Sequence, residues 1–575
     1  MTDYIYDPLT EYINVFRDRF KKVTEDTFEE LVSEAKIDID ANRKTCRQFE
    51  QTQKDIANVK RKITCIKVFC IFLWVIVVSI TTIALLSLVQ PRIWITIIIM
   101  VIPVLTVLLL LMKVHPFLRK LKETHDDLSG QAQALNTQAW EQMQPLNRLY
   151  DWDVLTRMIT KTVPGLEFDP YFTAQRLADL KVTYDWDDSF STERSVIFSH
   201  SGLINGNPFV ICRTRKMEMG SKIYTGSKTI HWTTQEKDKN GKWHTVSHSQ
   251  TLIASYEAPY PEYPEKVRLI YGNTAASNLV FNRKQSGLAG KERTSLYKRK
   301  MNFLRKKARD LVGADYAMLT NEEFETCFDT SNRNNNVEFA VLFTPVAQES
   351  MLNLLKDHEA GYGDDFDFDK NNMINTIEAN HMQELSLDMN PCNYQNFDFD
   401  KAKHEFYELN SQYFRAIYFC LAPILCIPVY QHIRPQQDIY GHDMKRQSAF
   451  WEHEALANFW GQQYFMDPSC VTQCILKTSI TSMEDSNKTI TVFAHGFRVE
   501  KRIAYFDVKG NDGQYHSVPV QWDEYLPVTG TGNIYLHEDN DLNDEATQQQ
   551  RLSHINDVLS SSNLSVYRRH IASKI

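Results

Sequence analysis

Two uncharged apolar stretches decide the fold of this chain: VFCIFLWVIVVSITTIALLSLV at residues 68–89 and IWITIIIMVIPVLTVLLLLM at residues 93–112. As helices, these 22 and 20 residues rise about 33 and about 30 Å, which matches a hydrocarbon core about 30 Å thick. Only Gln90, Pro91 and Arg92 separate them. A buried helix pair in a soluble protein rarely stays apolar on all sides over two such stretches. We therefore expect a two-helix transmembrane hairpin over residues 68–112.

Basic residues flank the hairpin unequally and predict its orientation. Nine lysines and arginines lie just outside the two spans, against Arg92 alone in the connecting turn. They are Lys54, Lys60, Arg61, Lys62, Lys67, Lys113, Arg119, Lys120 and Lys122. Since such residues favour the cytoplasmic side, we expect two spans in the plasma membrane, with both the N- and the C-terminus in the cytoplasm.

The sequence on either side of the hairpin predicts an antiparallel helical stalk. Residues 1–67 are interpreted as an N-terminal cytosolic amphipathic helix and residues 113–150 as a returning helix. In the returning helix apolar residues repeat at steps of three and four, which is typical of a coiled-coil seam. The seam positions are Leu118, Leu121, His125, Leu128, Ala132, Leu135 and Ala139. The histidine fits either a pH-sensitive position or a tolerated polar residue, and the seam offers a surface for oligomerisation.

The composition excludes several classes of protein. Lys and Arg number 64 against 72 Asp and Glu, a net charge of −8, so the chain as a whole is no polycation and we expect no nucleic-acid partner. Hydrophobic residues at 43% and charged residues at 24% match an ordinary globular average, which excludes global disorder and a many-span transporter. Ten cysteines in 575 residues are too few for a disulfide scaffold, so free thiols are expected.

Residues 151–290 are predicted to form a β-rich domain. Short β-rich stretches broken by turn residues indicate strands over 195–218, 227–256 and 266–273. The dipeptide Asn240-Gly241 between two alternating stretches predicts a tight hairpin turn, because such a turn needs positive φ at both central residues. The sequence YPEYP at residues 260–264 predicts an extended edge or a loop, since proline is excluded from central strands.

A basic segment and a strand-helix segment are predicted over residues 291–357. KERTSLYKRKMNFLRKKAR at residues 291–309 holds nine basic residues and one acidic residue, Glu292. Two interpretations stay open: a helix that lies on anionic lipid or nucleic acid, or a solvated helix face packed on its own domain. The candidate contacts to an anionic surface are Lys298, Arg299, Lys300, Arg305, Lys306 and Lys307. Over residues 322–357 we expect a strand, a polar turn, a second strand and then a helix.

Two short motifs carry a resemblance to a known group of proteins. Gly202 through Gly206 to Pro208-Phe209 follows a Gly-x-x-x-Gly-x-Pro-Phe turn, and LFTP at residues 342–345 follows a Leu-Thr-Pro-like step. With the anchor, these motifs resemble uncharacterised bacterial two-span membrane proteins that carry a β-rich domain of unknown function. The resemblance covers residues 151–357 and the anchor. It implies a paired-helix anchor before a β-rich cytoplasmic domain, and it implies no activity.

The remainder of the chain is expected to form three regions: a mixed, mostly helical region at 358–480, a second β-hairpin region at 481–535 and an acidic C-terminal tail at 536–575. The apolar stretch AIYFCLAPILCIPVY at residues 416–430 has 15 residues with Pro423 and Pro428, so we expect a buried core segment rather than a third span. Residues 513–518 match 241–246, which fits either two copies of one β unit or two generic hairpins.

The fold class expected is therefore a membrane-anchored α+β protein: a two-helix transmembrane hairpin with an antiparallel helical stalk, then β-rich cytosolic domains around a mixed helical region. Motifs for phosphate, zinc or a nucleophile elbow are missing, and we predict no catalytic residue, cofactor or metal. The expected function is a non-enzymatic scaffold that contacts membrane lipid and recruits an unidentified protein partner.

The alternative is a membrane-tethered hydrolase or lipid-modifying enzyme, in which His244, His248 and His516 converge in a cleft. A pocket with convergent titratable groups would favour the enzyme, and an exposed apolar patch the scaffold.

Overall fold

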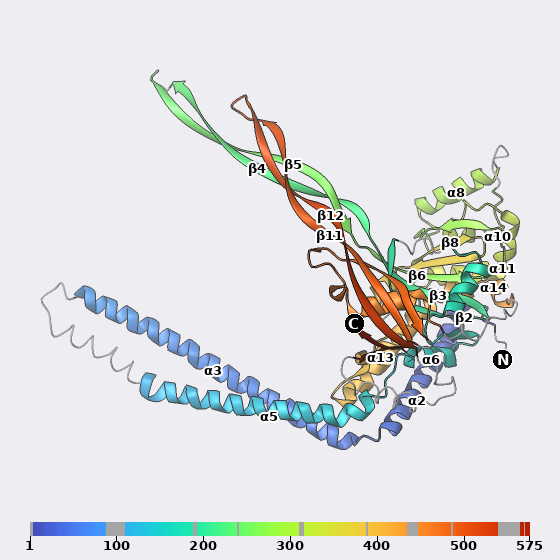
Figure 1. Ribbon diagram of the computed structural model, residues 1–575, viewed down its shortest axis with the longest axis horizontal. Coiled ribbons are helices and arrows are strands. Elements are labelled where there is room, and N and C mark those ends of the chain that lie inside the picture. Colours follow the sequence, from blue (N-terminus) through green and yellow to red (C-terminus); the bar gives the residue numbers. More distant parts are fainter. Residues whose placement is uncertain are drawn as a thin grey trace. The chain divides into compact units, whose positions relative to one another are not determined.

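The computed structural model describes residues 4–87, 110–187, 193–237, 241–309, 316–386, 389–433, 447–484, 487–538, 564–568 and 570–574. The chain is an α+β protein with a helical N-terminal region and a β-rich C-terminal region (Figure 1). It divides into two compact units. The first, here called the body, comprises Met1–Thr24, Asp151–Asn390 and Asn410–Ile575. The second, here called the stalk unit, comprises Glu25–Tyr150 and Pro391–Leu409.

The stalk unit is helical. It contains most of α2 (Arg17–Ala35), the long helix α3 (Ile39–Ser87), a π-helical turn η2 (Leu110–Val114) and α5 (His115–Asn147), with a short 3-10 helix η5 (Pro391–Tyr394) and the start of α13 (Phe399–Leu425). Helices α3 and α5 lie side by side (Figure 1). The seam predicted on α5 is confirmed, because its seven positions are buried or half-buried while most residues between them are exposed.

Helix α3 contains the apolar stretch of the first predicted span. The helix is long and apolar enough to cross a membrane, and its most apolar stretch within Ile39–Ser79 has a mean hydropathy of 2.2 and is 11% buried. The predicted second span, residues 93–112, lies outside the described residues except for its last three. Among the residues that the structure describes, there is thus one candidate membrane helix.

The body contains two large antiparallel sheets. The first has seven strands in the order β1-β2-β3-β6-β9-β8-β7. Their bounds are β1 (Leu166–Phe168), β2 (Arg194–Ile204), β3 (Asn207–Lys216), β6 (Glu265–Gly272), β9 (Ile374–Ala379), β8 (Phe366–Asn371) and β7 (Val280–Arg283). The turn from β2 to β3 consists of Asn205 and Gly206, both with positive φ, as a tight primed turn requires.

The second sheet has five strands in the order β10-β11-β12-β14-β13. They are β10 (Ile475–Glu484), β11 (Asn487–Lys509), β12 (Tyr515–Glu538), β14 (His570–Lys574) and β13 (Leu564–Tyr567). One apolar core joins this sheet to the first one and to helix α15 (Phe450–Trp460). It includes Val196 and Val210 of the first sheet, Val492 and Ile534 of the second, and Trp451 of α15.

Two hairpins extend into long ribbons (Figure 1). The first ribbon is the two-stranded sheet of β4 (Glu218–Lys237) and β5 (Trp243–Glu262). The second ribbon is the part of β11 and β12 beyond the five-stranded sheet, with β11 paired to β12 from Asn487 to Lys509. Both predicted hairpins are confirmed, and the extended edge expected at residues 260–264 is the end of β5.

The body contains further helices. They are α1 (Pro8–Glu11), the π-helix η1 (Tyr12–Phe16), α6 (Val154–Thr162), α7 (Ala174–Ala178), η3 (Asp179–Thr183), α8 (Ser295–Arg309), α9 (Glu322–Phe328), α10 (Asn336–Leu342), α11 (Pro345–Lys356), α12 (His381–Glu384), α14 (Pro428–His432) and η6 (Gln462–Tyr464). Residues 416–427 are buried in α13 and just beyond it, which confirms the expected core segment.

The strands expected within residues 322–344 are wrong, because α9 and α10 occupy this segment. The polar residues interpreted as turns are helix N-caps. The Asn321 side chain accepts the N–H of Phe324, and the Asn335 side chain accepts the N–H of Val337 and of Glu338. Such caps satisfy the first free N–H groups of a helix. The helix predicted after Pro345 is confirmed as α11.

Both ends of the chain also differ from the sequence expectation. Residues up to Thr24 belong to the body and not to a single amphipathic helix of the stalk, since Phe20 stacks on Phe414 at 4.0 Å.

At the C-terminus the expected tail contains β13 and β14, and β14 pairs with β12. The expected mostly helical region at 358–480 includes strands β8 and β9.

Candidate functional site

The two ribbons of the body pack against each other. A small apolar cluster at their crossing contains Ile230, Leu252 and Ala254 of the first ribbon with Val518 and Val520 of the second. All five side chains are buried. The crossing therefore stabilises two hairpins that as isolated ribbons would be marginal in water.

A glycine permits the close approach of the two ribbons. Gly226 on β4 lies under the backbone of β12, where a Cβ atom would clash with the carbonyl oxygen of Pro519 and lie 2.9 Å from the Cα of Val520. Gly226 pairs with Ala254 on the neighbouring strand. Small residues on both strands thus make room for the second ribbon.

The outer face of the first ribbon is a surface of hydroxyl groups. Ten exposed serines and threonines alternate along its two strands: Ser221, Thr225, Ser227, Thr229, Thr233, Thr245, Ser247, Ser249, Thr251 and Ser255. Two aliphatic side chains interrupt them, Ile223 at 67% and Ile253 at 66% exposure. Because alternate residues of a strand share one face, these groups lie on one side of the ribbon.

The outer face of the second ribbon carries an apolar patch, here called the outer patch, formed by Ile503, Tyr505 and Pro519; Tyr515 lies further along the same face, beyond the polar pair Asp507 and Ser517. Tyr505 lies opposite Pro519 in the strand register, and Ile503 is two residues away on the same face. Ile503, Tyr505 and Tyr515 are 51%, 67% and 71% exposed. Large apolar side chains that gather at one exposed place mark interaction sites, whereas single ones need no explanation.

The three histidines proposed for an enzymatic cleft are held by neighbours on their own ribbons. His248 stacks on Trp232, with ring centroids 5.3 Å apart, and its Nε2 lies 2.6 Å from the hydroxyl of Thr234. His516 contacts the Asp512 carboxylate at 2.8 Å. His244 is exposed and pairs in register with Glu236. These contacts are cross-strand or turn packing, as is common on hairpins.

Helix α15 buries two carboxylates in the core of the body. The Glu452 carboxylate accepts the N–H of Phe172 at 2.8 Å and pairs with Arg568 at 2.6 Å. Glu454 accepts the N–H of Val196 at 3.0 Å and lies 2.5 Å from the Lys477 ammonium. Burial raises the pKa of both carboxyl groups, that of Glu454 to about 7, although Lys477 lowers it. Desolvation of the charged form therefore exceeds the effect of the lysine.

A serine and a histidine next to these carboxylates resemble part of a catalytic triad, but their arrangement differs. The Ser448 hydroxyl contacts both the His453 Nε2, at 2.9 Å, and the Glu538 carboxylate. Lys488 donates to the same carboxylate at 2.7 Å. In a triad the histidine lies between serine and acid, whereas here the serine does. Ser448 is 5% exposed and His453 1%, so a substrate has no access in this conformation.

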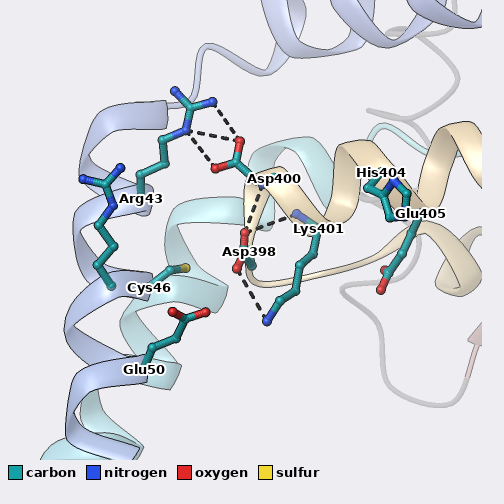
Figure 2. Close-up of a pocket in the computed structure, with 9 residues that line it drawn as sticks. Arg43, Cys46, Glu50, Asp398, Asp400, Lys401, His404 and Glu405 are labelled. Carbon is teal, nitrogen blue, oxygen red and sulfur yellow. Dashed lines mark hydrogen bonds and ion pairs between the residues drawn. The ribbon is translucent and has the colours of Figure 1, made fainter. Parts of the chain in front are cut away.

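A polar cavity of about 410 Å³ lies in the stalk unit (Figure 2). It is lined by Arg43, Cys46, Arg47, Glu50, Asp398, Asp400, Lys401, His404 and Glu405. Arg43 on α3 makes two contacts to the Asp400 carboxylate, of 2.8 and 3.0 Å, and Asp398 accepts the backbone N–H of Asp400 and Lys401. Burial raises the pKa of the Cys46 thiol to about 11, which leaves it a poor nucleophile. These charges hold the start of α13 against α3.

The basic helix α8 separates the six candidate contact residues into two groups. Lys300, Arg305 and Lys307 have partners within the body. Lys298, Arg299 and Lys306 are exposed to solvent. The interpretation as a helix face packed on its own domain therefore fits the first group, and the contact of the second group with an anionic surface stays a prediction.

Sequence reasoning missed the buried ionic groups of α15. The segment WEHE at residues 451–454 lacks a second histidine at the spacing of zinc ligands, but two acids between aromatic and aliphatic residues are also compatible with buried ion pairs. Their partners, Lys477 and Arg568, are far away along the chain, so the sequence gives no direct signal for them.

Comparison with models of protein families, with curated proteins and with solved structures finds no match to this chain. The resemblance to bacterial two-span proteins therefore rests on its two motifs. The first forms the turn between β2 and β3. The second, residues 342–345, lies between helices α10 and α11 and not between a strand and a helix.

Proposed function

We propose that this protein is a membrane-anchored scaffold that recruits a protein partner at the cytoplasmic face through the outer patch of its second ribbon. The observation that carries the proposal is the exposure of Ile503, Tyr505 and Tyr515 on one face of a ribbon fixed by its crossing with the first. Tyrosine and aliphatic side chains on a preorganised surface are typical of protein interfaces. Recruitment by a tethered scaffold raises the effective concentration of the partner and needs no catalytic residue.

Among the described residues, no arrangement of side chains specifically favours an enzymatic function. None of the three histidines lines the cavity of Figure 2, and the buried Ser448 and His453 are closed to solvent. We therefore retain the scaffold as the single candidate.

We also propose two spans with both flanks in the cytoplasm. The N-terminal segment packs into the body: Tyr418 donates its hydroxyl to the carbonyl of Pro8 at 2.8 Å, and Ile5 donates its N–H to the Gln431 side chain at 2.8 Å. Residues before and after the apolar stretches thus belong to one compact unit, which supports an even number of membrane crossings. The nine flanking basic residues support the cytoplasmic side.

The scaffold proposal is tested by site-specific photo-crosslinking of the full-length protein in cells. A benzophenone side chain is placed at Tyr505 in one strain and at Val337, an exposed position of α10 (75%), in the control strain. We expect a discrete protein adduct from position 505 and none from 337. Crosslinks to lipid alone from position 505 would contradict the proposal.

A matched pair of variants then measures the contribution of the outer patch. Ile503→Ser with Tyr505→Ser is expected to weaken capture of the crosslinked partner at least tenfold, because central interface side chains contribute about 1–2 kcal/mol or more each. Val337→Ser with Val341→Ser removes exposed apolar groups elsewhere on the body and is expected to leave capture unchanged. Equal losses in both double variants would show that the patch has no special role.

A further inference from the structure

Helix α8 has a buried side that fixes its orientation on the body. Tyr297 and Leu304 lie seven residues apart on one face and are 5% and 0% exposed. The helix begins after Thr294, whose side chain accepts the N–H of Tyr297 at 3.3 Å. The opposite side of the helix therefore faces away from the body.

Three of the cations on α8 are used within the body. Lys300 lies 2.5 Å from the Asp329 carboxylate, and Arg305 makes two contacts to Glu322, of 2.9 and 2.5 Å. Lys307 donates to the carbonyl oxygen of Ser331 at 2.6 Å. These three side chains help to hold α8 against the segment around α9.

The other three candidate cations, Lys298, Arg299 and Lys306, are exposed and have no ion pair among the described residues. Arg299 and Lys306 alternate with two large apolar side chains, Leu296 at 63% and Phe303 at 54% exposure. The order 296, 299, 303, 306 advances by three and four residues, so these four side chains form one stripe along the helix. Lys298 is exposed as well but lies outside this stripe.

We infer that this outward stripe of α8 binds the surface of an anionic phospholipid bilayer. Cations alone would fit any polyanion, but cations interleaved with phenylalanine and leucine are the pattern of helices that lie in the lipid interface. The leucine and phenylalanine side chains enter the boundary of the acyl chains, while the ammonium and guanidinium groups bind lipid phosphates. The inference is independent of the proposed protein partner.

The test uses the full-length protein with its apolar anchor already inserted in the bilayer of a nanodisc, so that the anchor does not bind the added vesicles. The protein is reconstituted in nanodiscs of phosphatidylcholine and mixed with sucrose-loaded vesicles of phosphatidylcholine, with or without 30% phosphatidylserine. We expect co-sedimentation with the anionic vesicles alone. Since each basic residue near an anionic surface contributes about a fivefold factor in affinity, Lys298→Ser, Arg299→Ser and Lys306→Ser together are expected to weaken binding about 100-fold.

Two controls separate this role from net charge and from folding. Lys300→Ser, Arg305→Ser and Lys307→Ser remove the same charge from the same helix, and we expect vesicle affinity within about threefold of wild type. Lys298→Arg with Lys306→Arg keeps the charge and should keep binding. Equal weakening by both triple variants, no dependence on phosphatidylserine, or tighter binding to a nucleic-acid duplex than to the vesicles would overturn the inference.

Discussion

The buried carboxyl of Glu454 makes the folding stability of this protein depend on pH. In the unfolded chain its carboxyl titrates near the ordinary value of 4.5, whereas burial in the body raises its pKa to about 7. Between these two values the folded state binds more protons than the unfolded state. The contribution of Glu454 to stability is therefore largest below pH 4.5 and falls as the pH rises to 7.

We predict that Glu454→Gln removes this dependence. Relative to wild type, the variant should become more stable by on the order of 3 kcal/mol between pH 4.5 and pH 7.5, the free energy that corresponds to the pKa difference. Thermal unfolding of the detergent-solubilised protein across this range measures the effect. Glu349→Gln changes an exposed carboxyl and serves as the control, and parallel curves for wild type and Glu454→Gln would contradict the prediction.

At the scale of elements, the sequence predicted hairpins well and short helices poorly. The hairpin of β4 and β5 follows from alternating apolar residues around a turn at Gly241, which has positive φ. Residues 322–344 were wrongly predicted as strands, because apolar residues such as Phe324 and Phe339 occur in helices of only seven residues. So short a helix gives little periodicity to recognise, and tertiary packing decides.

The candidate site was predictable only in part. The cations of α8 and the hairpins could be named from local sequence, yet the outer patch joins residues of two strands through the register that pairs Tyr505 with Pro519. A register is set by the pairing of the whole ribbon and by its turn. The crossing of the two ribbons depends on contacts between residues nearly 300 positions apart, for which the sequence holds no local signal.

The crossing of the ribbons predicts a specific effect at Gly226. Gly226→Val should force the ribbons apart and weaken their crossing by about 1–3 kcal/mol, because a larger side chain has no room beneath Pro519. Hydrogen exchange of the backbone amides at residues 515–523 should then accelerate about tenfold. Ser227→Val adds a comparable side chain on the exposed face and should leave exchange unchanged. Unaltered exchange in Gly226→Val would show that the ribbons do not cross closely in solution.

At the scale of the whole molecule, the body contains residues from both sides of the apolar stretches. The proposed topology predicts that cysteines introduced at Tyr6 and Val182, both exposed, react with a membrane-impermeant maleimide only after permeabilisation. A cysteine at Arg92, which the sequence places between the two apolar stretches, should react in intact cells. The ten natural cysteines are free thiols, of which Cys65 and Cys392 are exposed, so the introduced cysteines are placed in a variant in which these two are serine, and that variant, intact and permeabilised, is the control. If positions 6 and 182 were labelled from opposite sides of the membrane, an even number of membrane crossings between them would be disproved.

The last strands of the body have a consequence for how the protein is made. Arg568 pairs with Glu452, and β14 completes the pairing of β12, so the core of the body is complete only once β13 and β14 have been synthesised. At about 5–20 residues per second, more than 20 seconds of synthesis separate the apolar stretches from that point. The core of the body thus stays unfinished for that time, and truncation of the chain just before Arg568 should be as damaging to the body as truncation early in it.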